Sequence, residues 1–290
     1  MGDLRKPQFS KERRSFFSTP SPIRRTAFCG TFALLLWFVV INSIPPAHGA
    51  SSLYLPLILN QYTPRVCDPG FTQIGDPGDN VQILFGTPGI DHFCQYGFGG
   101  NDLQYVEADE GGDTIFQDGG TGDDHQTAIA GDGNDSIIQY GGEGKDTMYA
   151  EGGFGEKSIF QDGGPGDDIM EIAGGMEGGR FIQLGGLGND VMKLTGSTGD
   201  DIITINAGEG NDTITYTVTS GTDTVHIDGG PGDDILTVNK DKQSVTLVDG
   251  GGSVICQAGV GGTTITVVNV EHITAIVDDG LTPICKWDAP

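Results

Sequence analysis

The run GGPGDDIMEIA at residues 163–173, followed by GGMEGGRFIQL at 174–184 and GGLGNDVMKLT at 185–195, decides the fold. Each run has eleven residues and begins with two glycines. The same register extends without insertion from Gly75 to Asn239 and makes fifteen units. A short fixed period is typical of solenoids, in which each repeat packs only against its neighbours.

Two positions of the unit are nearly constant. The fourth is Gly in fourteen of the fifteen units, with Glu177 as the exception, and the sixth is Asp in twelve. The other units have Asn80, Lys157 or Gly179 at the sixth position. The twelve aspartates are Asp91, Asp102, Asp113, Asp124, Asp135, Asp146, Asp168, Asp190, Asp201, Asp212, Asp223 and Asp234.

The first six residues of a unit predict a turn, because glycine accepts positive φ, and the last five predict a strand. The eighth and tenth positions are mostly apolar, so we expect them to face inward on a strand of period two. Glutamines also recur every 22 residues, so two units should make one coil. One column is Gln95, Gln117, Gln139, Gln161 and Gln183, and a second is Gln82, Gln104 and Gln126, continued by Met148, Met170 and Met192. Inward-facing glutamine amides are expected to bond to one another from coil to coil.

This unit resembles the haemolysin-type calcium-binding (RTX) repeat, Gly-Gly-x-Gly-x-Asp-x-apolar-x, although it has eleven residues rather than nine. The resemblance covers residues 75–239. It implies an all-β fold, a right-handed parallel β-roll or β-solenoid, here with two 11-residue units per coil and about 7.5 coils. It also implies several Ca2+ ions, each between two consecutive turns of the same edge, held by the twelve sixth-position aspartates and by glycine carbonyls. Calcium accepts such oxygen ligands in tolerant geometry.

The two edges of the predicted roll differ. Units starting at 75, 97 and every 22 residues to 229 keep Asn80 or Asp at the sixth position, so eight turns could hold about seven ions. The other edge is interrupted by Lys157 and by Gly179-Arg180. We hypothesise that Lys157 and Arg180 supply fixed cations there; the alternative is simple decay of two units.

Charge narrows the range of partners. The chain has 15 Lys+Arg against 40 Asp+Glu, a formal net charge of -25, so we expect calcium ions as partners and no nucleic acid. A zinc site is not expected, because the histidines after the N-terminal region have no ligand spacing. These are His92, His125, His226 and His272.

The N-terminal region predicts export. Basic residues precede an apolar run from Phe28 to Ile41, and small residues precede Ala50, as in a signal peptide cleaved after Gly49. An uncleaved anchor is the alternative, and contact with a membrane is expected only in that case. Whether the signal is of the general or the twin-arginine type stays open. We expect a protein that is secreted or at the cell surface.

The cysteines fit such a location. Cys67, Cys94, Cys256 and Cys285 follow the predicted signal, and an even number in an exported chain favours two disulfides. Of three connectivities we favour Cys67–Cys94 with Cys256–Cys285.

One outward strand position carries an apolar stripe, Cys94, Phe116, Ile138, Phe160 and Ile182. An exposed stripe of this kind indicates an interface or a covering segment. We consider two alternatives, self-association through Phe116, Ile138, Phe160 and Ile182, or cover by a terminal segment of the same chain.

Four regions follow: a signal peptide at 1–49, an N-terminal linker or cap at 50–74, the roll at 75–239 and C-terminal capping strands at 240–290. Within 50–74 we expect Leu53–Leu59 to be a leading strand or short linker, and within 240–290 we expect strands at Ser244–Val248 and Thr263–Val270.

Enzymes of the resembled family carry a separate catalytic domain, and no catalytic motif stands outside the repeat, so no enzyme is expected. The function expected is a secreted calcium-binding protein that folds on calcium and has a structural or adhesive role. The alternatives are a roll that binds carbohydrate or ice through Thr204, Thr215 and Thr237, or an accessory module of an exported enzyme.

Overall fold

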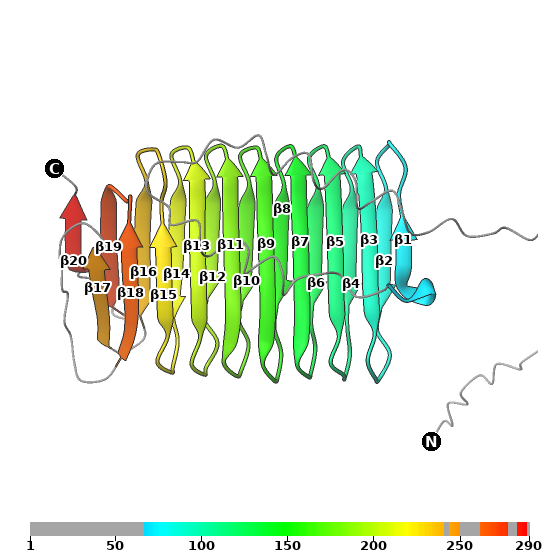
Figure 1. Cartoon of the computed structure of the whole chain (residues 1–290), viewed down its shortest axis with the longest axis horizontal. Coiled ribbons are helices and arrows are strands. Elements are labelled where there is room, and N and C mark those ends of the chain that lie inside the picture. Colours follow the sequence, from blue (N-terminus) through cyan, green and yellow to red (C-terminus); the bar gives the residue numbers. More distant parts are fainter. Residues whose placement is uncertain (1–66, 241–243, 250–261, 278–282, 289–290) are drawn as a thin grey trace, which may run out of the picture. The chain divides into compact units, whose positions relative to one another are not determined.

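The computed structural model describes residues 67–240, 244–249, 262–277 and 283–288, which form an all-β solenoid of two ten-stranded sheets (Figure 1). A short 3-10 turn at Pro69–Phe71 precedes it. The first sheet contains, in spatial order, β1 (Thr72–Ile74), β3 (His92–Gly99), β5 (Thr114–Thr121), β7 (Asp135–Glu143), β9 (Lys157–Pro165), β11 (Gly179–Leu187), β13 (Ile202–Glu209), β15 (Thr224–Asp228), β18 (Gly262–Val268) and β17 (Ser244–Asp249). The second contains β2 (Val81–Phe85), β4 (Leu103–Glu107), β6 (His125–Ile129), β8 (Thr147–Glu151), β10 (Ile169–Ala173), β12 (Val191–Thr195), β14 (Thr213–Val218), β16 (Ile235–Lys240), β19 (His272–Val277) and β20 (Pro283–Asp288).

Strand pairing confirms the predicted parallel roll with two units per coil. Gln117 lies beside Gln95 in the first sheet, and Met170 lies beside Met148 in the second. Both pairs are parallel and 22 residues apart. Like residues therefore stack on like residues, because the chain advances by one strand spacing for every two units.

The interior confirms the predicted alternation. A single apolar cluster runs through the roll and includes Phe93, Ile115, Met148 and Leu236. Both glutamine columns are buried and form ladders. Gln139, for example, donates to Gln117 Oε1 at 2.7 Å and to the Tyr149 carbonyl at 3.2 Å. The first column also includes Gln73, which accepts a bond from Gln95 at 3.0 Å. Each ladder thus satisfies amide groups that would be costly to bury alone.

The apolar stripe faces outward as predicted, and it is buried rather than exposed; the terminal residues 1–66, which the alternative of a covering segment invokes, lie outside the described residues. Its five members have exposed fractions of only 1–9% and form a cluster separate from the interior. Tyr96, Tyr140 and Leu184, from the neighbouring position of the same face, pack against them, together with Cys67. The Tyr140 ring lies 5.9 Å from that of Phe116 and 5.6 Å from that of Phe160. These bulky neighbours contribute to the burial of the stripe.

The ends of the roll extend the repeat. β1 already pairs with β3, so the first sheet begins before Gly75. At the other end the two predicted strands correspond to β17 and β18, and the structure adds β19 and β20, the last of which is antiparallel to β19. β18 pairs with β15 and β19 with β16, so the chain resumes the coil after residues 240–261.

The predicted disulfide Cys67–Cys94 is present. For the second predicted pair, Cys256 lies outside the described residues, as do the predicted signal peptide and the segment Leu53–Leu59. Within the described ranges, no helix is long and apolar enough to cross a membrane.

Candidate metal sites

All twelve sixth-position aspartates end a turn and are buried, with exposed fractions of 0–6%. The turns form two edges. The first edge consists of the turns that lead into the second sheet. The last residues of these turns are, in order, Asn80, Asp102, Asp124, Asp146, Asp168, Asp190, Asp212 and Asp234. The second edge consists of the turns that lead into the first sheet. The last residues of these turns are Asp91, Asp113, Asp135, Lys157, Gly179, Asp201 and Asp223.

One oxygen of each first-edge carboxylate has a structural role. The backbone N–H of Asp146 donates to Asp168 Oδ1 at 2.7 Å, and the same bond repeats from coil to coil. This spine runs from the N–H of Asn80 to Asp102 Oδ1 at one end, and from the N–H of Asp234 to Glu271 Oε2 at the other. The bonds satisfy a buried N–H at every turn and hold each carboxylate in one orientation.

The other oxygen has no such role. In all seven first-edge aspartates the buried Oδ2 atom has no hydrogen-bond partner among the described residues. A buried ionised oxygen without a partner is strongly unfavourable, so it requires either a proton or a cation. These seven atoms belong to Asp102, Asp124, Asp146, Asp168, Asp190, Asp212 and Asp234.

Three second-edge aspartates provide an internal comparison. Asp91 Oδ2 accepts bonds from the N–H and hydroxyl of Thr87 at 2.8 and 3.0 Å. Asp201 Oδ2 accepts the Ser197 N–H at 2.7 Å, and Asp223 Oδ2 accepts the Tyr216 hydroxyl at 2.6 Å. The same oxygen at the same repeat position is therefore satisfied by protein donors at three second-edge turns and, among the described residues, at none of the first-edge turns.

Backbone carbonyls approach the unpartnered oxygens. A Cβ atom placed on Gly163 would lie 2.5 Å from Asp168 Oδ2 and 2.6 Å from the carbonyl oxygen of Gly185, one coil further on. At Gly141 the corresponding distances are 2.5 Å to Asp146 Oδ2 and 2.7 Å to the Gly163 carbonyl oxygen. Glycine is the usual residue at this first position, because a Cβ atom at Gly141 or Gly163 would come close to both oxygens; Ala207 is the exception on this edge.

Burial makes these carboxylates hard to ionise when no cation is near. It raises the pKa of Asp146 and Asp168 to about 7 and the pKa of Asp124 and Asp190 to about 6, although each accepted backbone N–H lowers it. Neighbouring aspartates raise it further. A cation among them would remove this penalty, because it favours the charged form.

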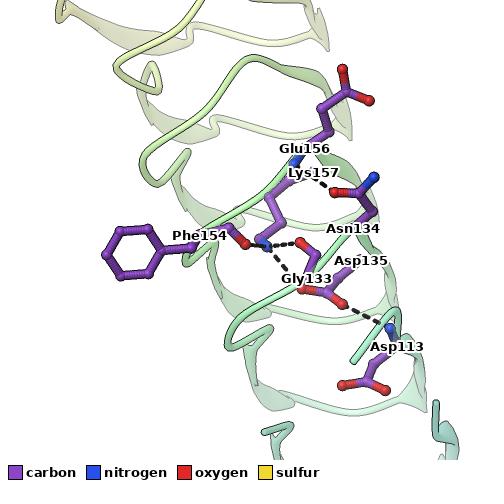
Figure 2. Close-up of polar contacts among 7 residues, drawn as sticks. All are labelled: Asp113, Gly133, Asn134, Asp135, Phe154, Glu156 and Lys157. Carbon is purple, nitrogen blue, oxygen red and sulfur yellow. Dashed lines mark hydrogen bonds and ion pairs between the residues drawn. The ribbon is translucent and has the colours of Figure 1, made fainter. Parts of the chain in front are cut away.

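Lys157 shows where a positive charge lies between two turns (Figure 2). Its Nζ lies 2.8 Å from Asp135 Oδ2 and also donates to the carbonyl oxygens of Gly133 and Phe154. Both charged side chains are completely buried. Arg180 differs: its side chain is partly exposed, and no ion pair of it is found within the described ranges. The hypothesis of a fixed cation thus gains support at Lys157 but not at Arg180.

Side-chain carboxylates alone do not form a metal centre. Among the described residues, no three His, Cys, Asp or Glu side chains come close enough to hold an ion together. Each turn contributes a single buried carboxylate at its sixth position, so an ion between two turns would depend on backbone carbonyls for its remaining ligands, as calcium permits.

Sequence reasoning placed the aspartates correctly but missed the donors that satisfy some of them. Thr87 and Ser197 stand at the second position of their units, where most first-edge units have Gly. A hydroxyl at that position would have been the signal. Comparisons of the chain with models of protein families, with curated proteins and with solved structures found no match.

Proposed function

We propose that this chain is a calcium-binding β-roll of the haemolysin-type repeat kind, exported from the cell, which folds on calcium and has a structural or adhesive role. The observation that carries the proposal is the row of seven buried Oδ2 atoms on the first edge that have no hydrogen-bond partner among the described residues. Three aspartates at the same repeat position on the second edge, Asp91, Asp201 and Asp223, show that the fold can satisfy this oxygen with a protein donor.

The surroundings of Lys157 support a cation rather than only protons. Three oxygens from two consecutive turns approach one ammonium nitrogen: a sixth-position carboxylate and two turn carbonyls. The resembled family implies this set of oxygens around calcium. Calcium is favoured over magnesium because an irregular set of carbonyls and carboxylates suits its flexible coordination, whereas magnesium demands near-octahedral geometry.

Charge couples binding to folding. Without residues 1–49 the chain would keep 8 Lys+Arg against 38 Asp+Glu, a formal charge of −30. Repulsion of this size opposes compaction, and ions that bind only the folded roll would offset it and raise stability with their concentration. The expectations of export and of no catalytic activity belong to the same proposal.

The threonine surface of the carbohydrate or ice alternative does not lie on one face. Thr204 is in β13 of the first sheet, whereas Thr215 and Thr237 are neighbours in the second sheet. This separation makes the alternative less favourable, because a binding plane needs its side chains on one face.

A calcium titration tests the proposal. The chain is prepared in chelator, and far-UV circular dichroism and hydrodynamic radius are followed as calcium or magnesium is added. We expect calcium to produce compaction and β signal at concentrations where magnesium does not. A chain that is already compact in chelator and binds no calcium by equilibrium dialysis would refute the proposal.

A matched pair of variants locates the sites. Asp168→Asn keeps an oxygen that can accept the Asp146 N–H but removes the charge, and it is expected to lower the number of bound calcium ions by at least one. Glu171→Gln makes the same charge change on an exposed residue and should leave that number unchanged. Equal calcium binding by both variants would contradict first-edge binding.

A further inference from the structure

We infer that four of the five aspartate turns on the second edge are held together without metal, with Lys157 as a built-in replacement for one cation. Calcium then binds along the first edge and, on the second edge, only at the turn of Asp113. This inference rests on the proposed function, because it states where that function's ions bind and where they do not.

The position of the Lys157 ammonium is the first step. A lysine is rarely buried without a partner, because removing an ammonium from water costs several kcal/mol. Here the Nζ atom has three oxygen partners, Asp135 Oδ2 and the carbonyl oxygens of Gly133 and Phe154 (Figure 2). These partners come from two consecutive turns, 22 residues apart in register. The tethered ammonium therefore neutralises Asp135 in the place between turns where an ion would otherwise be required.

Hydroxyl and amide donors do the same for three other aspartates. Asp201 has both oxygens in bonds with Ser197, through its N–H at 2.7 Å and its hydroxyl at 2.6 Å. Asp223 accepts the buried Tyr216 hydroxyl and the Thr263 hydroxyl. Thr87 fills this role for Asp91. A metal at these turns would have to displace good protein hydrogen bonds, which removes the advantage of binding there.

Two units of the second edge lack the carboxylate altogether, since Lys157 and Gly179 take its place. The N–H of Gly179 still donates to Asp201 Oδ1 at 2.8 Å, so the backbone spine resumes on the far side of Lys157. Among the described residues, the Oδ2 atoms of two second-edge aspartates, Asp113 and Asp135, have no hydrogen-bond partner. That of Asp135 pairs with the Lys157 ammonium, so only that of Asp113 has neither kind of partner there. Its unit has Asp109 at the second position, where Asp91 and Asp201 have a hydroxyl residue.

Calcium counting separates this inference from the proposed function. Equilibrium dialysis is carried out on the full chain and on Asp168→Asn and Asp201→Asn. We expect Asp168→Asn to lose at least one ion and Asp201→Asn to lose none. If neither variant loses an ion because the parent binds none, the proposed function fails. If Asp201→Asn loses as many ions as Asp168→Asn, metal also binds at the Asp201 turn and the inference is overturned.

The role of Lys157 is tested by two replacements. Lys157→Asp restores the carboxylate of the repeat and is expected to bind one more calcium ion than the parent and to melt at a temperature that depends more steeply on calcium. Lys193→Asp makes the same charge change on an exposed residue and should do neither. A folded Lys157→Asp chain that binds no additional calcium would overturn the assignment.

Single and double variants of Lys157 and Asp135, melted in chelator, test the same role without any bound calcium. Lys157→Met leaves the Asp135 carboxylate buried and unpaired, so its melting temperature should fall well below that of Lys193→Met. Adding Asp135→Asn removes the unpaired charge and should recover most of the loss. Melting temperatures of Lys157→Met and Lys193→Met that agree would show that the ammonium does not balance Asp135. These variants decide the matter if Lys157→Asp does not fold.

Discussion

Replacing Gln139 with Met is expected to destabilise the roll by about 3 kcal/mol, since the middle of a glutamine ladder depends on both neighbours. Gln139 donates to Gln117 Oε1 at 2.7 Å and to the Tyr149 carbonyl at 3.2 Å, and it accepts a bond from Gln161 at 2.8 Å. Methionine has a similar shape and takes the place of glutamine in the other inward column, at Met148, Met170 and Met192. Steric disturbance should therefore be small.

The magnitude follows from counting bonds. Each buried hydrogen bond contributes about 1 kcal/mol net, and a buried group left without its partner costs about 1–3 kcal/mol. The variant loses three bonds and leaves Gln117 Oε1 and one Gln161 N–H unsatisfied, while the apolar side chain of Met offsets part of the cost.

The matched control is Gln183→Met at the end of the ladder. Gln183 Oε1 has no hydrogen-bond partner among the described residues, and only its amide nitrogen bonds, to Gln161 Oε1 and to the Lys193 carbonyl. Replacing Gln183 removes its unsatisfied Oε1 atom but leaves Gln161 Oε1 without a donor. We therefore expect the free energy of unfolding to fall by only about 1 kcal/mol. Urea unfolding at saturating calcium measures both variants. Equal losses would refute the view that the ladder stabilises through bonds to both sides.

Further outcomes test the turns, the ends and the pH dependence. Burial holds the pKa of Asp146 and Asp168 at about 7, above the ordinary value of 3.8, so in chelator their contribution to stability is present below about pH 4 and is lost as the pH rises through about 7. Calcium competes with these protons, so its affinity by titration calorimetry should weaken as the pH falls from about 8 to about 5; a pH-independent affinity would contradict these ligands. Gly163→Ala should lower thermal stability by about 1–3 kcal/mol, because its Cβ would lie 2.5 Å from Asp168 Oδ2, whereas Gly112→Ala, whose nearest atom is 3.4 Å away, should be tolerated. Replacing both Cys67 and Cys94 with Ser should cost about 3–4 kcal/mol by the loop-entropy estimate, since the bond closes a separation of 27 residues; unchanged melting would show that the N-terminal coil does not depend on it.

The repeat made the fold predictable from the sequence. A strict period of eleven residues, with glutamines every 22, leaves one arrangement in which like residues stack, and the register of Gln95 beside Gln117 is that arrangement. The inward-facing positions were equally predictable, because the alternation of a strand depends only on neighbours along the chain. The contacts of Phe116 with Tyr96 and Tyr140 were not, since the two tyrosines belong to adjacent coils.

The candidate sites divide in the same way. Sequence alone determined which residues stand at the end of each turn and that the two edges differ, because both facts are properties of the repeat. Only the tertiary structure decided which carboxylate oxygens have partners. Lys157 reaches Asp135 and Gly133 one coil away, and Thr263 reaches Asp223 across 40 residues. The physical reason is that a buried charge is satisfied by whatever donors the packed coils bring to it, and those donors follow no period in the chain.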